Sequence, residues 1–204
     1  MLKKFEVGYM PTNCYVLSDG EIAVIVDPGG GYGKISAYLN ENGLNPVAVL
    51  LTHGHFDHIL DVHKWQKEGV DIFIHEDEAS CLFTPEENIS SMIGLTIPPV
   101  RMYKTFSDGD VLTFGKLSFK VIHTPGHTKG SCCFIMDDGS VLTGDTLMCE
   151  TYGRTDFPGG STDRIVSSIK DKLFSLEGDR LIYPGHGDSS TLNHERRFNP
   201  VLYL

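Results

Sequence analysis

Residues 46–58, PVAVLLTHGHFDH, pass from an apolar run directly into three histidines and an aspartate. The apolar run predicts a buried strand, and such a strand belongs to the interior of a layered fold. His53, His55, Asp57 and His58 then fall where a strand leads into a loop, which is where a rigid scaffold presents functional side chains. So many imidazole and carboxylate groups in so short a stretch indicate a metal site.

Strand and helix patterns alternate around this run. Segments rich in Val, Ile and Tyr, separated by turn signals such as Ser18-Asp19-Gly20, predict strands at 13–17, 21–29, 46–55 and 71–78. Apolar residues at helical spacing, followed by glycine, predict helices at 33–43 and 59–69, with one more helix ending near residue 83. The next segment, 84–100, contains three prolines and is predicted to be a loop over the site.

The second half repeats the mixture of strands and helices. Strands are predicted at 110–126, 131–145 and 180–188, and Asp138-Gly139 is a hairpin signal. Residues 161–176 have the clearest helical spacing, with Ser161 or Thr162 as the cap, and 191–200 predicts a short helix. Helices mixed with strands in both halves fit an α+β fold in which two packed sheets carry helices on their outer faces.

Composition limits the classes of protein that the chain can belong to. Its 204 residues predict one domain, and a net charge of -10 argues against a nucleic-acid partner. No apolar run approaches the ~20 residues of a membrane span, and the N-terminus lacks the pattern of a secretory signal. An odd number of cysteines, five, predicts reduced thiols and a cytoplasmic protein. The oligomeric state stays open.

Three later stretches also place polar residues where predicted strands end. They are TPGHTKGS with His127, VLTGDTL with Asp145, and YPGHGD with His186. Together with HxHxDH they make five imidazoles and two carboxylates, whereas a catalytic zinc ion typically takes three protein ligands. Two ions that share one carboxylate would use all seven groups, and zinc, iron and manganese all accept such ligands.

The remaining histidines have simpler explanations. His63 and His194 lie on predicted helices and His75 ends a predicted strand, so all three are expected to be ordinary surface residues. His123 lies close to His127 in sequence and is a candidate for a supporting contact behind a metal ligand. The single tryptophan, Trp65, is expected in the core.

These motifs resemble those of the metallo-β-lactamase superfamily, and within it the glyoxalase II-like hydrolases, over almost the whole chain. HxHxDH, PGHTKGS, GDT and PGHG occur in that family's order. The resemblance implies a four-layer αββα sandwich over residues 1–204. It also implies that His53, His55 and His127 bind one ion, that Asp57, His58 and His186 bind the other, and that Asp145 bridges them.

Details of the motifs separate the branches of this superfamily. The common zinc β-lactamases carry a cysteine ligand in the region of Asp145, which argues against antibiotic hydrolysis here. Flavodiiron oxidoreductases replace the second histidine of the motif by glutamate, whereas this chain has His55. The tRNA-maturing branch normally adds an RNA-binding arm, and the net charge of -10 without a basic segment argues against that branch. The stretch GRTDFPGGS at 153–161 is similar to that of short, single-domain glyoxalase II-like proteins.

The resemblance also suggests where a substrate would bind. Arg154 falls where glyoxalase II has a basic residue facing the glutathione carboxylates. The longer enzymes add a C-terminal helical domain that supplies much of the glutathione pocket, and they have a tyrosine in place of Asp156. Without that domain, Arg154 and Lys129, with Arg196 or Arg197 as further candidates, are predicted to contact the substrate.

The expected activity is hydrolysis of a thioester such as S-lactoylglutathione or a related 2-hydroxyacyl thioester. Two divalent ions, zinc being the first expectation and iron or manganese the alternatives, would share a hydroxide that Asp57 orients. A thiol of pKa near 8.5 leaves as thiolate without a protein acid. The alternative is a persulfide dioxygenase with a single iron, and a remote one is a metal-binding domain without activity.

Overall fold

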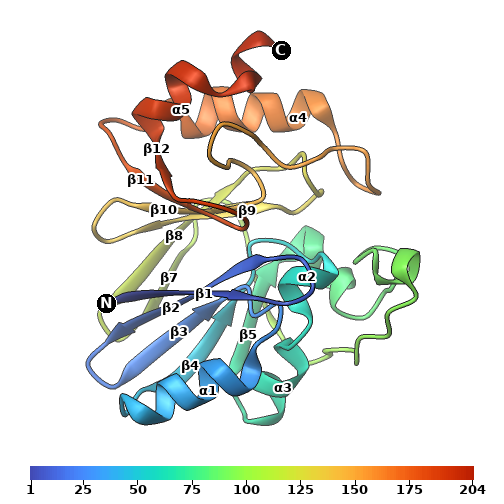
Figure 1. The fold of residues 1–204 in the computed structure, drawn as a ribbon, viewed down its shortest axis with the longest axis vertical. Helices are drawn as coiled ribbons and strands as arrows, with labels where there is room; N and C mark the ends of the chain where they lie inside the picture. The colour runs from blue at the N-terminus through green and yellow to red at the C-terminus, as the bar shows by residue number, and fades with distance from the viewer.

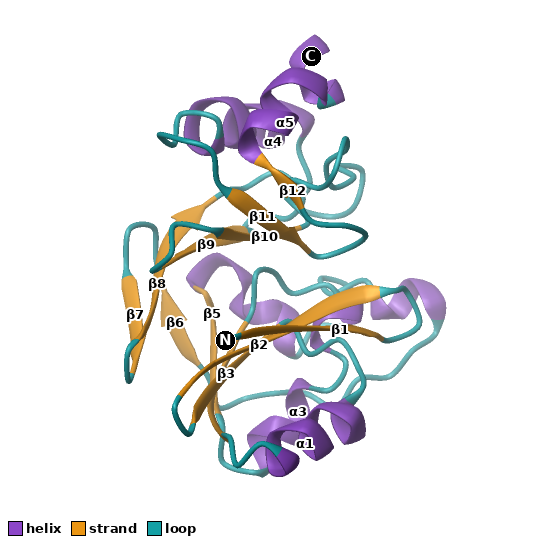
Figure 2. Cartoon of the chain, turned by 60° about the vertical axis from the view of Figure 1, so that its left-hand side comes forward, coloured by secondary structure: helices purple, strands orange, loops and turns teal.

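Two six-stranded sheets lie face to face and carry helices on their outer sides, as Figures 1 and 2 show. The computed structural model describes residues 1–204. The first sheet has its strands in chain order: β1 (Leu2–Val7), β2 (Thr12–Asp19), β3 (Ile22–Val26), β4 (Asn45–Leu50), β5 (Asp71–His75) and β6 (Lys104–Phe106). Strands β3 to β6 are parallel to one another, and β1 to β3 are antiparallel.

The second sheet has the order β12-β11-β10-β9-β8-β7. Its strands are β7 (Val111–Phe114), β8 (Leu117–His123), β9 (Cys132–Met136), β10 (Val141–Gly144), β11 (Leu181–Pro184) and β12 (Ser190–Thr191). Only β10 and β11 are parallel in this sheet. A crossover that contains α4 joins these two strands, as a parallel connection requires.

Helices cover the outer face of each sheet. The first sheet carries α1 (Tyr32–Glu41) and α3 (Val62–Lys67), and the second carries α4 (Thr162–Ser167) and α5 (Leu192–Phe198), with α4 continuing as the π-helical segment η3 (Ser168–Leu173). Shorter segments are α2 (Phe56–Ile59), η1 (Glu76–Leu82), η2 (Ser90–Ile93) and η4 (Pro200–Tyr203). No helix has both the length and the apolar character needed to cross a membrane.

Alternation along the central strands explains the four layers. In β4, Ala48 and Leu50 belong to the core between the sheets, while Val49 faces the core beneath α1 and α3. Successive side chains of a strand point to opposite faces, so a continuous apolar run buries both sides of the sheet. Trp65 of α3 is fully buried in the outer core, as the sequence predicts. The predicted αββα sandwich is therefore confirmed.

The strand ends that carry the motif residues meet at one edge of the sandwich. Thr12 of β2 forms an isolated β-bridge with His186, and the backbone N–H of Asn13 donates to the carbonyl oxygen of Gly185 at 2.7 Å. From the other side, the N–H of Cys132 donates to the carbonyl oxygen of Thr52 at 2.9 Å. These backbone bonds fix the two sheets to each other beside the motif residues.

Several element boundaries differ from the prediction. Strand β4 stops at Leu50, so the predicted strand at 46–55 is too long and the histidines lie in the loop beyond it. The predicted helix at 59–69 is interrupted, because α2 ends at Ile59 and α3 starts at Val62. Residues 110–126 form a hairpin that turns at Gly115, where φ is 61° and only glycine is free of strain. The edge strands β1 and β6 were not predicted, since pairing rather than apolar pattern defines them.

Candidate metal centre

Two groups of ligand atoms form at the edge where the sheets meet. His53 and His55, from the loop after β4, lie beside His127, from the loop after β8. Asp57 and His58, from α2, lie beside His186, from the loop after β11. Within each group the ligand atoms all lie within 4.8 Å of one another. We call these groups the first triad (His53, His55, His127) and the second triad (Asp57, His58, His186).

Asp145 lies between the two triads, directly after β10. Its Oδ2 is 3.5 Å from Nε2 of His127, in the first triad, and 3.5 Å from Nε2 of His186, in the second. Its Oδ1 is 3.4 Å from Nε2 of His58. One carboxylate thus reaches both triads. The structure therefore brings together all seven residues that the sequence singled out.

Polar contacts hold the Nδ1 atoms of three imidazoles, so that their Nε2 atoms face the centre. Nδ1 of His58 lies 3.0 Å from a carboxylate oxygen of Asp27. Nδ1 of His127 donates to the carbonyl oxygen of Arg154, and Nδ1 of His186 to that of Pro11, both at 2.8 Å. Such contacts fix the tautomer and the orientation of metal-ligating imidazoles.

Asp27 is the functional residue that sequence reasoning missed. It is buried just after β3, and its carboxylate accepts hydrogen bonds from Thr52, from the backbone N–H at 2.8 Å and from Oγ1 at 2.6 Å. The hydroxyl of Thr52 in turn lies 3.1 Å from Nδ1 of His53. Asp27 therefore supports one imidazole of each triad. The available signal was its position in EIAVIVDPG, a carboxylate at the end of a buried strand.

The chemistry of the donor set fits metal ions. Four buried atoms at the centre have no hydrogen-bond partner: Nε2 of His53, Nε2 of His55, Nε2 of His127 and Oδ1 of Asp145. Each buried polar atom without a partner costs about 1–3 kcal/mol. Unpartnered nitrogen and oxygen atoms that converge on one point are the ligands that zinc, iron and manganese accept. The seven residues can therefore hold two ions.

The electrostatics of the two triads differ. Burial lowers the pKa of His55 to about 3 and holds the pKa of His53 well below its ordinary value, so both imidazoles are neutral. Burial also acts on His186, but the carboxylates of Asp145 and Asp57 outweigh it and raise its pKa to about 10. The pKa of His58 is raised for the same reason, by Asp57, Asp145 and Asp27 against the effect of burial. Without metal, the second triad therefore holds protons at neutral pH.

Metal uptake is consequently expected to release protons. His58 and His186 carry protons near pH 7 in the metal-free protein, and an imidazole must be neutral to bind a metal. Affinity should therefore rise with pH up to the raised pKa of about 10 at His186 and fall as the pH is lowered. Calorimetric titration in buffers of different ionisation enthalpy measures the release. Metal uptake without proton release at pH 7 would contradict this charge state.

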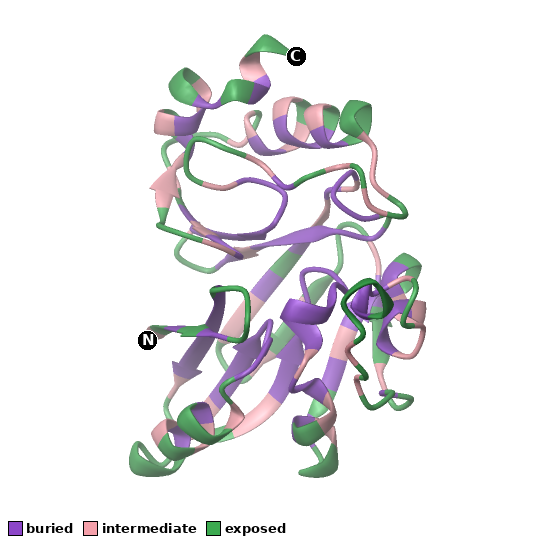
Figure 3. Ribbon diagram, turned by 45° about the vertical axis from the view of Figure 1, so that its right-hand side comes forward, coloured by how far each residue is buried: buried purple, intermediate pink, exposed green.

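A cavity of about 550 Å³ opens above the centre. His55, Asp57, His127, Asp145 and His186 form one side of it. Half of its lining residues are apolar: Met10, Phe56, Ile89, Met92, Ile93, Met148 and Phe157. Ile89, Met92 and Ile93 come from the segment 84–100, which therefore contributes to the wall. This segment lies at the right-hand edge of Figure 1, in green, and is turned toward the viewer in Figure 3; its residues 91–99 are exposed or partly exposed.

The predicted substrate-binding residues are placed differently from one another. Arg154 lines the cavity, where it stacks on Phe157 at 3.9 Å and forms two hydrogen bonds, of 2.7 and 2.6 Å, with the carboxylate of Asp156. Lys129 does not line this cavity, and its Nζ lies 3.0 Å from Glu87. Arg196 donates to carbonyl oxygens of the segment after η3, among them that of Phe174 at 3.0 Å. A contact of Arg154 or Lys129 with substrate stays a prediction.

The other histidines lie outside the seven. His75 is buried rather than on the surface, and its ring stacks on that of His123 with centroids 4.1 Å apart. Nε2 of His123 lies 3.0 Å from the carbonyl oxygen of Lys129. His123 therefore contacts the backbone two residues after His127, and the contact is not with the His127 ring. His63 and His194 are partly exposed, on α3 and α5.

Relatives of similar length share the sequence pattern. A Mycobacterium leprae protein of uncharacterised function is 42% identical, over 99% of this chain and 98% of its own. The hydroxyacylglutathione hydrolase GloC of Haemophilus influenzae is 36% identical, over 93% of this chain and 92% of its own. The probable metallo-hydrolase YqgX of Bacillus subtilis is 35% identical, over 98% and 96%.

Solved structures share the fold. The BLEG-1 B3 metallo-β-lactamase superposes with a TM-score of 0.93 at 35% identity, over 99% of both chains. TTHA1623, solved in a di-iron-bound form, gives 0.87 at 33% identity over 99% of this chain and 100% of its own. ETHE1 from Myxococcus xanthus gives 0.80 at 28%, over 98% and 83%. The sequence profile of the metallo-β-lactamase superfamily matches residues 7–186, and the chain belongs to that superfamily.

Proposed function

We propose that the chain is a metal-dependent hydrolase of thioesters, with S-lactoylglutathione or a related 2-hydroxyacyl thioester as substrate. The observation that carries the proposal is the pair of triads joined by Asp145, with unpartnered nitrogens at one side of a 550 Å³ cavity. The likeness to the hydroxyacylglutathione hydrolase GloC supports the thioester class.

Two divalent ions, zinc in the first instance and iron or manganese otherwise, would activate water and polarise the thioester carbonyl. Asp57 supplies the orienting carboxylate: its Oδ2 lies 3.2 Å from Nε2 of His186 and accepts a hydrogen bond from Oγ1 of Thr12 at 3.3 Å. These partners leave Asp57 able to accept a hydrogen bond from the attacking water.

The cavity offers no separate acid for the leaving group. Its titratable lining residues are the five ligands already named and Arg154, which stays protonated. A thiol leaves as thiolate near neutral pH without protonation, whereas an alcohol or amine needs a proton. The missing acid therefore favours a thioester over an ester or an amide.

We expect the guanidinium of Arg154 to contact a carboxylate of the thiol carrier, that is, of the thiol part of the substrate. Its two hydrogen bonds to Asp156 lower the pKa of that carboxyl to about 2 and compete with a substrate carboxylate for the guanidinium. Asp156→Asn should lower KM for S-lactoylglutathione by a few-fold, and Arg154→Ala should raise it, both with little change in kcat. Opposed shifts would be absent for a thioester of an uncharged thiol, which serves as the control substrate. Equal KM values in all three proteins would show that Arg154 does not contact the carrier.

A second candidate is the single-iron oxidation of a persulfide. The structural likeness to ETHE1 from Myxococcus xanthus favours it. The likeness to the BLEG-1 B3 metallo-β-lactamase also makes a β-lactam a necessary comparison, even though no cysteine lies among the seven residues. All five cysteines are free thiols, in keeping with the cytoplasmic location that we expect.

A panel of substrates on one metallated sample tests the proposal. Thiol release from S-lactoylglutathione and from an uncharged 2-hydroxyacyl thioester is compared with oxygen uptake on glutathione persulfide and with opening of a chromogenic β-lactam. We expect thiol release to exceed the other two activities, and to disappear when a chelator removes the metal. Oxygen uptake without thiol release would favour the second candidate.

A further inference from the structure

Glu78 is a fully buried carboxylate that lies outside both triads, on η1. Its Oε1 accepts a hydrogen bond from the backbone N–H of Gly54 at 3.2 Å, and its Oε2 accepts one from the N–H of Gly130 at 2.8 Å. Hydrogen bonds to an ionised carboxylate are about twice as strong as those between neutral groups. One side chain therefore holds two separate backbone segments together.

Both segments carry ligands of the first triad. Gly54 lies between His53 and His55, and Gly130 lies three residues after His127. The two loops come from different sheets, one after β4 and the other after β8, and the hydrogen bond from Cys132 to Thr52 joins their bases. Glu78 thus spans the joint that brings the three imidazoles of the first triad together.

The two glycines allow η1 to approach this closely. A Cβ atom at Gly54 would lie 2.3 Å from Cβ of Cys81, and one at Gly130 would lie 2.7 Å from Oε2 of Glu78. Neither residue has a positive φ, so the glycines are required by this contact and not by backbone conformation. The loops therefore lie directly against η1.

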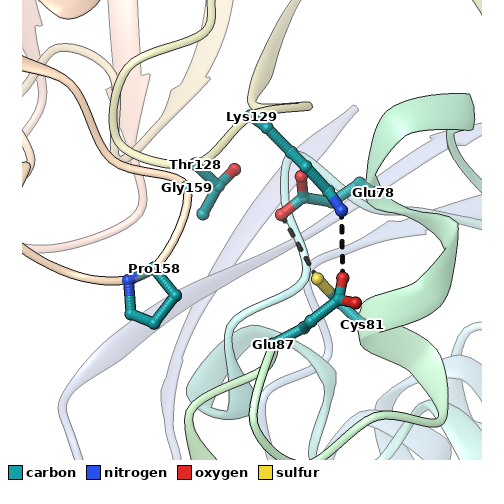
Figure 4. A pocket seen from close by; sticks show the side chains of 7 residues that line it. All are labelled: Glu78, Cys81, Glu87, Thr128, Lys129, Pro158 and Gly159. Carbon is teal, nitrogen blue, oxygen red and sulfur yellow. Dashed lines mark hydrogen bonds and ion pairs between the residues drawn. The ribbon is translucent and has the colours of Figure 1, made fainter.

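The surroundings of Glu78 separate it from solvent-exposed charges nearby. Glu78 lines a cavity of about 90 Å³. Figure 4 shows it close to Cys81 and to the ion pair of Lys129 and Glu87. The side chains of Lys129 and Glu87 are 45% and 38% exposed, so that pair is a surface pair of small energetic value. Glu78, in contrast, bonds only inside the protein.

We propose that Glu78 is a positioning residue that holds the first triad in its metal-binding arrangement. The second triad is held by other groups, namely Asp27 and the carbonyl oxygen of Pro11, and does not depend on Glu78. The inference rests on the metal centre of the proposed function and on no particular substrate. Loss of Glu78 should therefore weaken one ion and leave the other in place.

The test compares Glu78→Gln and Glu78→Ala with the natural chain by metal titration against a chelator, without substrate. Glutamine keeps one acceptor oxygen but turns an NH2 group toward the other backbone N–H, and alanine removes both acceptors. The affinity of the ion at the first triad should fall about 10- to 100-fold, as it does when partners behind metal ligands are removed. NMR signals of the His55 and His127 rings, against those of His186, identify the site that empties.

Glu87→Gln is the matched control. It removes a carboxylate from the same cavity, but this carboxylate pairs with the side chain of Lys129 and not with the backbone of either ligand loop. It should retain both ions. Equal weakening of both sites, or full retention of both ions in Glu78→Gln, would overturn the proposal.

Amide hydrogen exchange in the metal-free natural protein adds a test that needs no variant. The Gly54 and Gly130 amides should be protected, and rapid exchange at both would also overturn the proposal. Failure of the substrate panel alone leaves these readouts unchanged.

Discussion

Asp57→Ala is expected to abolish thioester hydrolysis while the fold is retained. The carboxylate is buried at the side of the cavity, where it contacts His186 and Thr12, and it is the group that we assign to orient the attacking water. Its loss should lower kcat by at least ~10²–10⁴-fold, the usual range for a group that positions or transfers a proton. Thiol release per metallated protein measures the effect.

Metal content must be determined on the same sample, because Asp57 also belongs to the second triad. Asp57→Asn is the closer variant, since it preserves the shape and one acceptor oxygen of the side chain. Asp61→Asn is the matched control: this buried carboxylate lies between α2 and α3, accepts from the N–H of Tyr32 at 2.9 Å and does not touch the cavity. Turnover that survives Asp57→Ala would remove Asp57 from the chemistry.

Asp145→Ala is expected to have the second large effect, on metal binding itself. The carboxylate is the only group whose oxygens lie within 3.5 Å of imidazoles of both triads. Without it the triads share no ligand, and His58 and His186 lose a carboxylate that raises their pKa. We expect the protein to hold fewer than two ions and turnover to fall by more than about 100-fold.

The same variant changes the proton balance in a defined direction. With Asp145 absent, the pKa values of His58 and His186 move down, so fewer protons are released when metal binds near pH 7. Calorimetry in two buffers measures this together with the stoichiometry. Two ions bound with natural affinity by Asp145→Ala would contradict the bridging position of this residue.

Much of the scaffold can be read from local sequence. The apolar run before His53 marks a strand whose successive residues, Val49 and Leu50, enter different cores, and such a continuous apolar run predicts a sheet buried on both faces. Strand ends that carry histidine or aspartate are local features too. These two patterns are sufficient to predict both the sandwich and the seven residues.

The supporting residues depend on contacts between distant segments, so a single sequence does not reveal them. Asp27 acts on His58, 31 positions away, and Glu78 acts on Gly130, 52 positions away. A lone acidic residue after a strand or in a short helix is ordinarily solvated, and only burial distinguishes these two. Strand β1 lacks a clear apolar pattern for a similar reason, because it is an edge strand defined by pairing with β2.

We propose that seven side chains form one centre for two ions and that this centre hydrolyses a thioester. The most direct measurement adds metal stepwise to the metal-free protein and follows thiol release from S-lactoylglutathione, or from the thioester that the panel selects, together with bound metal. We predict that activity rises until two ions are bound per chain and then stays constant. Full activity with one ion bound, or no thiol release with two ions bound, would contradict a two-ion thioesterase centre.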